Sequence, residues 1–251
     1  MSSFSLNDNA GGNVVLSAPE SGSPVTLTLP TGTANILSNA IPAGNTTVAP
    51  IQFTSGTNLT TAAAGSVEYD GKVFYGTGQS TERGVLPTQQ LYYLNANIAG
   101  GNDTTTRSIF GVGVTLAAST VYIMEGSIYF TRAAGTTSHT LNFSFGGTAT
   151  LNNIYYQCSV GKPTAPNTWD NAGDQSIANI TTSAPITDAL TTQNTVGAVV
   201  RGTVNANVGG TFIPQYNASV APGGAYTVVQ GSFITFTPIG SSGNISVGPW
   251  A

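Results

Sequence analysis

Charged side chains are scarce in this chain. Lysine, arginine, aspartate and glutamate make up 6% of its 251 residues, against roughly 25% in an ordinary soluble domain. The six basic residues are scattered singly and the formal net charge is −4, so the chain offers no basic patch to the phosphates of a nucleic acid. We therefore predict that nucleic acid is not among its partners.

Cysteine and histidine are each present once. Cys158 cannot form an internal disulfide and lies in an aromatic, apolar run at residues 154–158, where we expect a small buried side chain. His139 precedes a strong strand pattern, at a place where a hairpin loop is expected. Zinc requires three or four ligands together, and a Ser-His-Asp triad needs a nucleophile elbow; neither pattern occurs. The sequence therefore predicts no catalytic residues, no cofactor, no metal site and no enzymatic activity.

Long apolar runs are also missing. Nowhere do about 18 apolar residues follow one another, so we expect no membrane-spanning helix and no membrane partner. The first residues lack the basic segment and the apolar core of a signal peptide. We therefore expect the product to stay soluble where it is made, or to be assembled there.

Glycine is abundant, at 31 residues, and short runs that alternate apolar and polar side chains lie between Gly, Pro, Asn and Ser. Helical periodicity is almost absent. Residues 86–94 are the exception, because they could form either one helical turn or the start of a strand. This pattern predicts an all-β protein built as a sandwich or a barrel.

The strand patterns divide the chain into three regions. Residues 1–48 contain two strand-like runs, at 11–16 and 24–30, and form an extended β-rich N-terminal arm. A unit of two strands is not stable alone in water, so this arm must lie on the rest of the chain or on another subunit. Residues 49–84 form a connector, in which Asp70 and Gly71 separate two short apolar runs and predict a hairpin.

Residues 85–251 read as one domain. Leu141, Phe143 and Phe145 alternate with polar residues, which places these three side chains in a core. Further strands are expected at residues 121–130, 196–208, 211–213, 226–229 and 233–236. Strands at this spacing, without intervening helices, predict an antiparallel jelly-roll sandwich.

Residues 200–204, 210–224 and 231–240 resemble a jelly-roll module of tailed-phage structural proteins, which is itself similar to the trimeric heads of the C1q and tumour-necrosis-factor type. Residues 12–35 and 51–71 resemble connectors found in phage tail fibres and virion surface proteins. The resemblance implies a homotrimer located in the virion and assembled in the host cytoplasm.

The position within the virion is left open by the resemblance. Tail fibres usually begin with a sizeable anchor and continue into a long shaft, whereas here the strand-like sequence starts within about a dozen residues of Met1. This favours a capsid decoration (cement) protein that binds the major capsid protein and bridges capsomers. The alternative is a short tail fibre or baseplate-tip protein, which would contact tail or baseplate proteins and bind a host surface glycan through its jelly-roll loops.

Aromatic residues supply the candidate ligand-binding positions. Tyr156 and Trp169, the latter in a loop rich in Pro and Asn, could stack on a sugar. The competing interpretation is that one of Tyr155 and Tyr156 packs in the core while the other is exposed.

Two carboxylate pairs invite a chemical interpretation. Glu68 with Asp70, or Asp170 with Asp174, could cleave a glycan, and the segment from Asp170 to Asp174 could hold Ca²⁺. However, the turn with Gly71 explains Asp70, and residues 170–174 lack the spacing of a calcium loop. We therefore expect structural roles for all four carboxylates.

The low charge has a physical implication of its own. An isolated subunit that exposes so much uncharged surface would tend to associate. We therefore expect much of the surface to be covered by sister subunits, because the centres of obligate interfaces are poor in charge.

Overall fold

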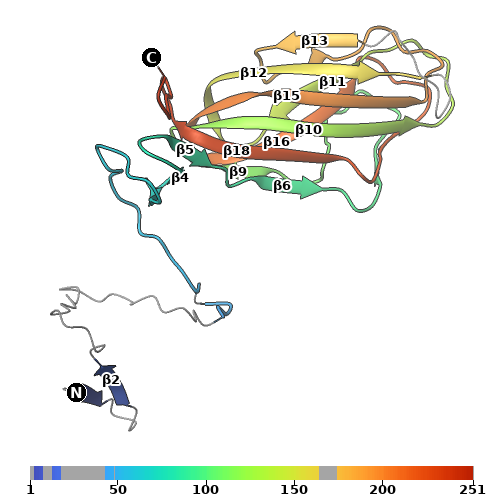
Figure 1. Cartoon of the computed structure of the whole chain (residues 1–251). Coiled ribbons are helices and arrows are strands. Elements are labelled where there is room, and N and C mark those ends of the chain that lie inside the picture. Colours follow the sequence, from blue (N-terminus) through green and yellow to red (C-terminus); the bar gives the residue numbers. More distant parts are fainter. Residues whose placement is uncertain (1–2, 8–12, 18–42, 48, 164–173, 251) are drawn as a thin grey trace. The chain divides into compact units, whose positions relative to one another are not determined.

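The computed structural model describes residues 3–7, 13–17, 43–47, 49–163 and 174–250 (Figure 1). The chain divides into two compact units, Met1–Gln52 and Phe53–Ala251. Every regular element in the described residues is a β-strand, and every strand pair is antiparallel. No helix in this part of the chain could cross a membrane. The all-β class predicted from the sequence is therefore confirmed.

The first unit contains one described hairpin. Strands β1 (Ser3–Asn7) and β2 (Asn13–Ser17) pair from Ser3 opposite Ser17 to Asn7 opposite Asn13. Strand β2 falls in the run predicted at residues 11–16, whereas β1 was not predicted. The second predicted run, residues 24–30, lies outside the described residues.

The second unit begins with a three-stranded sheet formed by β3 (Val67–Tyr69), β4 (Phe74–Thr77) and β5 (Arg83–Leu86). The hairpin predicted at Asp70 and Gly71 is confirmed. Gly71 has φ +93°, a conformation that glycine adopts without steric cost. The Asp70 Oδ1 atom accepts hydrogen bonds from the backbone N–H groups of Lys72 and Val73, both at 2.8 Å. This turn is held by its own carboxylate.

One compact unit runs from Phe53 to the C-terminus, so most of the predicted connector belongs to the same unit as the residues that follow it. Lys72 shows one reason: its Nζ donates a hydrogen bond to the backbone oxygen of Ser119, at 2.7 Å.

Two sheets form the sandwich that follows. The larger sheet has eight strands, β6 (Gln90–Tyr93), β7 (Ile98–Ala99), β10 (Thr120–Arg132), β12 (Thr150–Gly161), β13 (Asp174–Ala178), β15 (Thr195–Val208), β17 (Tyr226–Val228) and β18 (Phe233–Ser241). The smaller sheet has five, β8 (Arg107–Ser108), β9 (Val114–Leu116), β11 (Leu141–Gly146), β14 (Ala184–Pro185) and β16 (Gly210–Ala218).

The strand order in the larger sheet is β13-β12-β15-β10, and β10 then pairs with both β18 and β17. Strands β10, β12, β15 and β18 run side by side as its broad centre (Figure 1). Successive strands pass from one sheet to the other, since β11, β14 and β16 belong to the smaller sheet and β12, β15 and β17 to the larger. The predicted antiparallel sandwich is confirmed. The segment at residues 86–94 is a strand entry and not a helical turn, because β6 occupies Gln90–Tyr93.

The core lies between these two sheets. Leu141, Phe143 and Phe145 are buried as predicted, and the Phe145 ring stacks on Phe212 with 4.9 Å between centroids. Burying an aromatic or aliphatic side chain of this size contributes about 1.5–3 kcal/mol. Cys158 has no exposed surface, and its burial raises the pKa of the thiol to about 12. The prediction that Cys158 is a small buried side chain is confirmed.

Candidate functional site

The two neighbouring tyrosines of β12 point in opposite directions. Tyr156 is 2% exposed and its ring packs edge-on against Phe145, whereas Tyr155 is 55% exposed. Burial removes both ring faces of Tyr156 from any sugar, so the ligand-binding role predicted for Tyr156 is corrected. The competing interpretation, with one tyrosine in the core and the other exposed, is confirmed. Trp169, the second predicted ligand-binding residue, lies outside the described residues.

The carboxylates of the first predicted pair stabilise the three-stranded sheet. Glu68 forms an ion pair with Arg83 at 2.8 Å and accepts a hydrogen bond from the backbone N–H of Leu59. The Leu59 N–H and the Arg83 guanidinium together lower the pKa of Glu68. Burial alone would raise the pKa of Asp70, but hydrogen bonds from Val73 and Lys72 lower it overall. Glycoside hydrolysis needs one carboxyl group whose pKa is raised, and neither of these two has that property.

His139 lies in the segment between β10 and β11, where the sequence predicted a hairpin loop, but its side chain is buried. It pairs with Leu190 through a β-bridge and is 3% exposed. Its Nδ1 lies 2.9 Å from the Thr137 carbonyl oxygen, which can only accept, so Nδ1 carries the proton. Nε2 then accepts a hydrogen bond from the Tyr226 hydroxyl at 2.8 Å. Burial, with a contribution from Arg132, lowers the pKa of His139 and favours its neutral form.

Arg132 is a buried cation that the sequence analysis did not single out. Its guanidinium donates to the carbonyl oxygens of Thr191 at 2.6 Å, Gln193 at 3.0 Å and Gly135 at 3.3 Å, and also to that of Pro222. It therefore connects three loops at the end of β10. A single arginine within an alternating strand carries no signal of this role, because the loops that it joins come from distant parts of the sequence.

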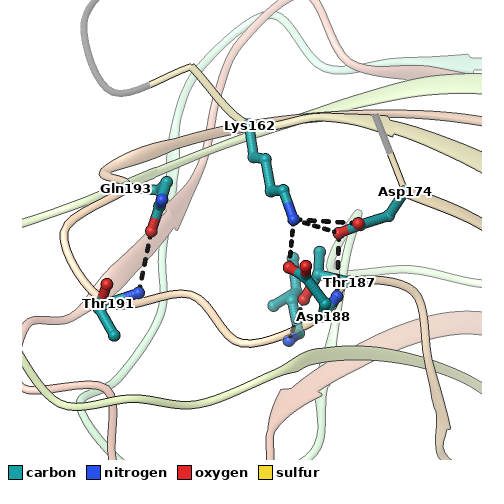
Figure 2. Close-up of polar contacts among 7 residues, drawn as sticks. Lys162, Asp174, Thr187, Asp188, Thr191 and Gln193 are labelled. Atoms are coloured by element: carbon teal, nitrogen blue, oxygen red, sulfur yellow. Dashed lines mark hydrogen bonds and ion pairs between the residues drawn. The ribbon is translucent and has the colours of Figure 1, made fainter. Parts of the chain in front are cut away.

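A second buried cation, Lys162, follows the end of β12 (Figure 2). Its Nζ lies 3.0 and 2.9 Å from the two carboxylate oxygens of Asp174 and also contacts Oδ1 of Asp188. The backbone N–H of Asp188 donates to Asp174 Oδ2 at 2.9 Å. Burial opposes the charge on Lys162, but the hydrogen bonds from its amine to Asp188 and Asp174 raise its pKa overall. This group is called the Lys162 cluster below.

The Lys162 cluster also bears on the segment from Asp170 to Asp174, where we considered Ca²⁺ but expected a structural role. Asp170 lies outside the described residues, and Asp174 already contacts a cation, the Lys162 ammonium group. Within the described ranges, no group of three or more His, Cys, Asp or Glu side chains could hold a metal ion.

Arg132, His139 and the Lys162 cluster share one end of the sandwich. The register places Phe130 opposite Val196 and Val160 opposite Ala198, so β10 and β12 end where β15 begins. Arg132, Lys162 and Asp188 lie at this end, which is called the loop end below.

The face of the larger sheet that points away from the core has a different character. One row crosses six strands in the order Ile177, Gln157, Arg201, Glu125, Thr235 and Leu91. Exposed apolar and aromatic side chains lie in this row and beside it, at Leu91, Tyr93, Ile123, Tyr129, Tyr155, Ile177 and Val199. Arg201 and Glu125 are the charged residues that these six strands direct outward, and they lie 3.8 Å apart. This surface is called the outer face below.

An apolar crevice opens at the free edge of β6. Its volume is about 290 Å³, and its lining includes Tyr92, Phe110, Val112, Pro214 and Phe236. None of its lining residues is charged, so it lacks the charged groups that often fix a polar ligand in place.

Fold and contacts together define an all-β, antiparallel sandwich protein whose buried charges connect loops. No family model and no curated protein matches the chain. A solved structure described as "Structure of infectious bursal disease virus Gx strain" is similar to it at 9% sequence identity and a TM-score of 0.17, over 66% of this chain and 45% of that one. The chain thus spans less than half of that structure's chain, and at this TM-score the similarity supports no conclusion about function.

Proposed function

We propose that this chain is a non-enzymatic, homotrimeric structural protein of a bacteriophage virion. Its specific role in the proposal is capsid decoration: it binds the major capsid protein and bridges neighbouring capsomers, which adds buried surface to the shell. The outer face is the observation that carries the proposal. The trimeric state and the virion location in the proposal come from the resemblance of residues 200–240 to a phage jelly-roll module.

The outer face has the composition of a surface covered by protein. Its exposed apolar side chains come from five strands, and Arg201 and Glu125 are 75% and 52% exposed. Exposed apolar side chains gathered on one face of a sheet mark interaction sites, and Arg201 and Glu125 are the charged residues that the six strands direct outward on it. A cyclic trimer is compatible with the charged pair, because Arg201 of each chain can lie beside Glu125 of the next.

The charged groups support a structural role in place of catalysis. Lys162 and Arg83 are paired with carboxylates, and Arg132 is enclosed by backbone carbonyls. His139, the one histidine of the sequence, is buried and bonded at both ring nitrogens. These charged and titratable groups stabilise loops and hairpins. A catalytic acid, base or nucleophile would instead need to be free to contact a substrate.

Three measurements test the proposal. Sedimentation of the full chain at micromolar concentration should show a trimer, and a stable monomer would contradict it. Gel densitometry of purified virions should find hundreds of copies per particle. A few dozen copies or fewer would instead support the short tail fibre or baseplate-tip adhesin. Release of reducing sugar from host polysaccharide would overturn the non-enzymatic proposal.

A further inference from the structure

The Lys162 cluster combines three chemical functions at one point of the loop end (Figure 2). Lys162 offers a primary amine, Asp174 offers a carboxyl group that the amine contacts through both oxygens, and Asp188 offers a second carboxylate on the same amine. The two aspartates come from different places, because Asp174 begins β13 whereas Asp188 follows β14. An ion pair needs only one of them.

We propose that Lys162 and Asp174 form an intramolecular amide bond, with the Asp188 carboxylate as the base. The reaction begins from the ion pair. Asp188 takes a proton from Nζ and passes it to the Asp174 carboxylate, and the neutral amine then attacks Cγ of the Asp174 carboxylic acid to form the new C–N bond. One C–O bond of Asp174 breaks, and the protonated oxygen leaves as water with one further proton from Nζ. The net change is the loss of one water molecule, so no oxidant, reductant or cofactor is required.

The contacts assign these roles. Nζ lies 3.0 and 2.9 Å from the two oxygens of Asp174, which places the amine next to the carbon that bears both. The backbone N–H of Asp188 donates to Asp174 Oδ2 at 2.9 Å, where it stabilises the negative charge that develops on oxygen during the attack. The Asp188 side chain is 67% exposed, against 19% for Asp174. The base is therefore in contact with solvent and the electrophile is the more buried partner.

Burial of the amine favours condensation. The Lys162 residue is 6% exposed, so little water competes with the amine. Holding two reacting groups together in one geometry is equivalent to a concentration of about 10⁵–10⁸ M in favourable cases. The loop that carries Asp188 is itself fixed, because the Thr187 hydroxyl accepts a hydrogen bond from the backbone N–H of Leu141 at 2.9 Å. An amide here closes the chain between the end of β12 and the start of β13 into a covalent ring.

Intact-mass spectrometry of the folded full chain tests the proposal. The wild-type mass should be lower than the sequence mass by one water molecule. Digestion with a protease that cuts before aspartate should cleave at Asp170 and leave the two flanking peptides joined through Lys162 and Asp174. Lys162→Arg keeps the positive charge and the carboxylate contacts but has no primary amine, so it should show the full sequence mass. Asp174→Asn should lose ammonia in place of water, and Asp188→Asn should form the amide much more slowly.

The matched control is Glu68→Gln, which breaks another ion pair and should leave the water loss unchanged. A wild-type mass equal to the sequence mass would overturn the proposal and leave an ion pair only. A bond to Asp188 in place of Asp174 would overturn the assigned roles. Water loss that persists in Lys162→Arg would also overturn it, because Asp70 next to Gly71 can lose water by cyclising on the backbone. The proposal does not depend on the proposed function, since its result is read from mass and not from oligomeric state or copy number.

Discussion

The loop end and the outer face of the sandwich use charge in opposite ways. At the loop end, Arg132 and Lys162 are buried, and both contact groups that lie far away in the sequence. On the outer face, Arg201 and Glu125 are exposed and separated by 3.8 Å. A buried cation that loses its partners costs far more than an exposed one. The difference is that the buried charges stabilise loops, whereas the outer face exposes its charged pair among apolar side chains.

The largest effect should come from Arg132. Arg132→Ala removes the donor to four carbonyl oxygens in three loops, and we expect the free energy of unfolding to fall by about 3–5 kcal/mol. Urea denaturation measures the change. Arg201→Ala is the matched control from the outer face, and should cost no more than about 0.5 kcal/mol in the isolated chain. If Arg132→Ala and Arg201→Ala lowered the free energy of unfolding equally, the buried and the exposed arginine would not differ in their contribution to stability.

The next effect concerns association. Val199→Lys places an ammonium group among the apolar side chains of the outer face, where Val199 is exposed. We expect dissociation of the proposed trimer to increase by tenfold or more, which corresponds to about 1.4 kcal/mol, while the thermal stability of the monomer changes little. Sedimentation measures the shift. Val220→Lys, at an exposed site in the loop before β17, should leave association unchanged; a similar loss in both variants would argue against the outer face as the interface.

A smaller effect separates two tyrosines. Tyr226→Phe removes the hydroxyl that donates to His139 Nε2 and should lower the free energy of unfolding by about 1–2 kcal/mol. Tyr155→Phe removes a hydroxyl from the outer face and should leave the unfolding free energy of the isolated chain unchanged. Chemical denaturation of both variants compares buried and exposed groups of the same chemistry. A larger loss of unfolding free energy in Tyr155→Phe than in Tyr226→Phe would contradict this prediction.

The free energy of unfolding should also depend on pH, through His139 at the loop end. Because the folded pKa of His139 is lowered, the unfolded chain binds a proton more readily than the folded chain. Stability is therefore complete above the unfolded pKa of about 6.5 and decreases as the pH falls below it, by at most about 1.4 kcal/mol per pH unit. Unfolding free energies of wild type and His139→Gln between pH 5 and about 7.5 test this. An identical slope in the two proteins would exclude His139 as the source.

Local pattern was sufficient to predict much of the fold. The alternation in β11, the Asp70-Gly71 turn and the burial of Cys158 all follow from neighbouring residues. The same information did not decide which of Tyr155 and Tyr156 enters the core, because side chains alternate along a strand and a shift of one residue exchanges the two faces. Pairing of β12 with β15 settles that choice.

The loop-end contacts were beyond the reach of sequence patterns. Lys162 meets Asp188 across 26 positions, and Arg132 meets Pro222 across 90. His139 was expected in a loop, yet its bridge to Leu190 and the Tyr226 hydroxyl place it in the core. The periodicity of a single strand does not predict these contacts, because they depend on which strand ends lie beside one another in the two sheets.

The sequence by itself determined the all-β class, the positions of β10, β11, β15, β16 and β18 and the shortage of charge, because each depends on composition or on neighbouring residues. Only the tertiary structure decided where the remaining charges lie. Strand register brings distant residues into contact, and burial then makes a paired charge far more stable than an unpaired one. The same register aligns exposed apolar residues from five strands on the outer face.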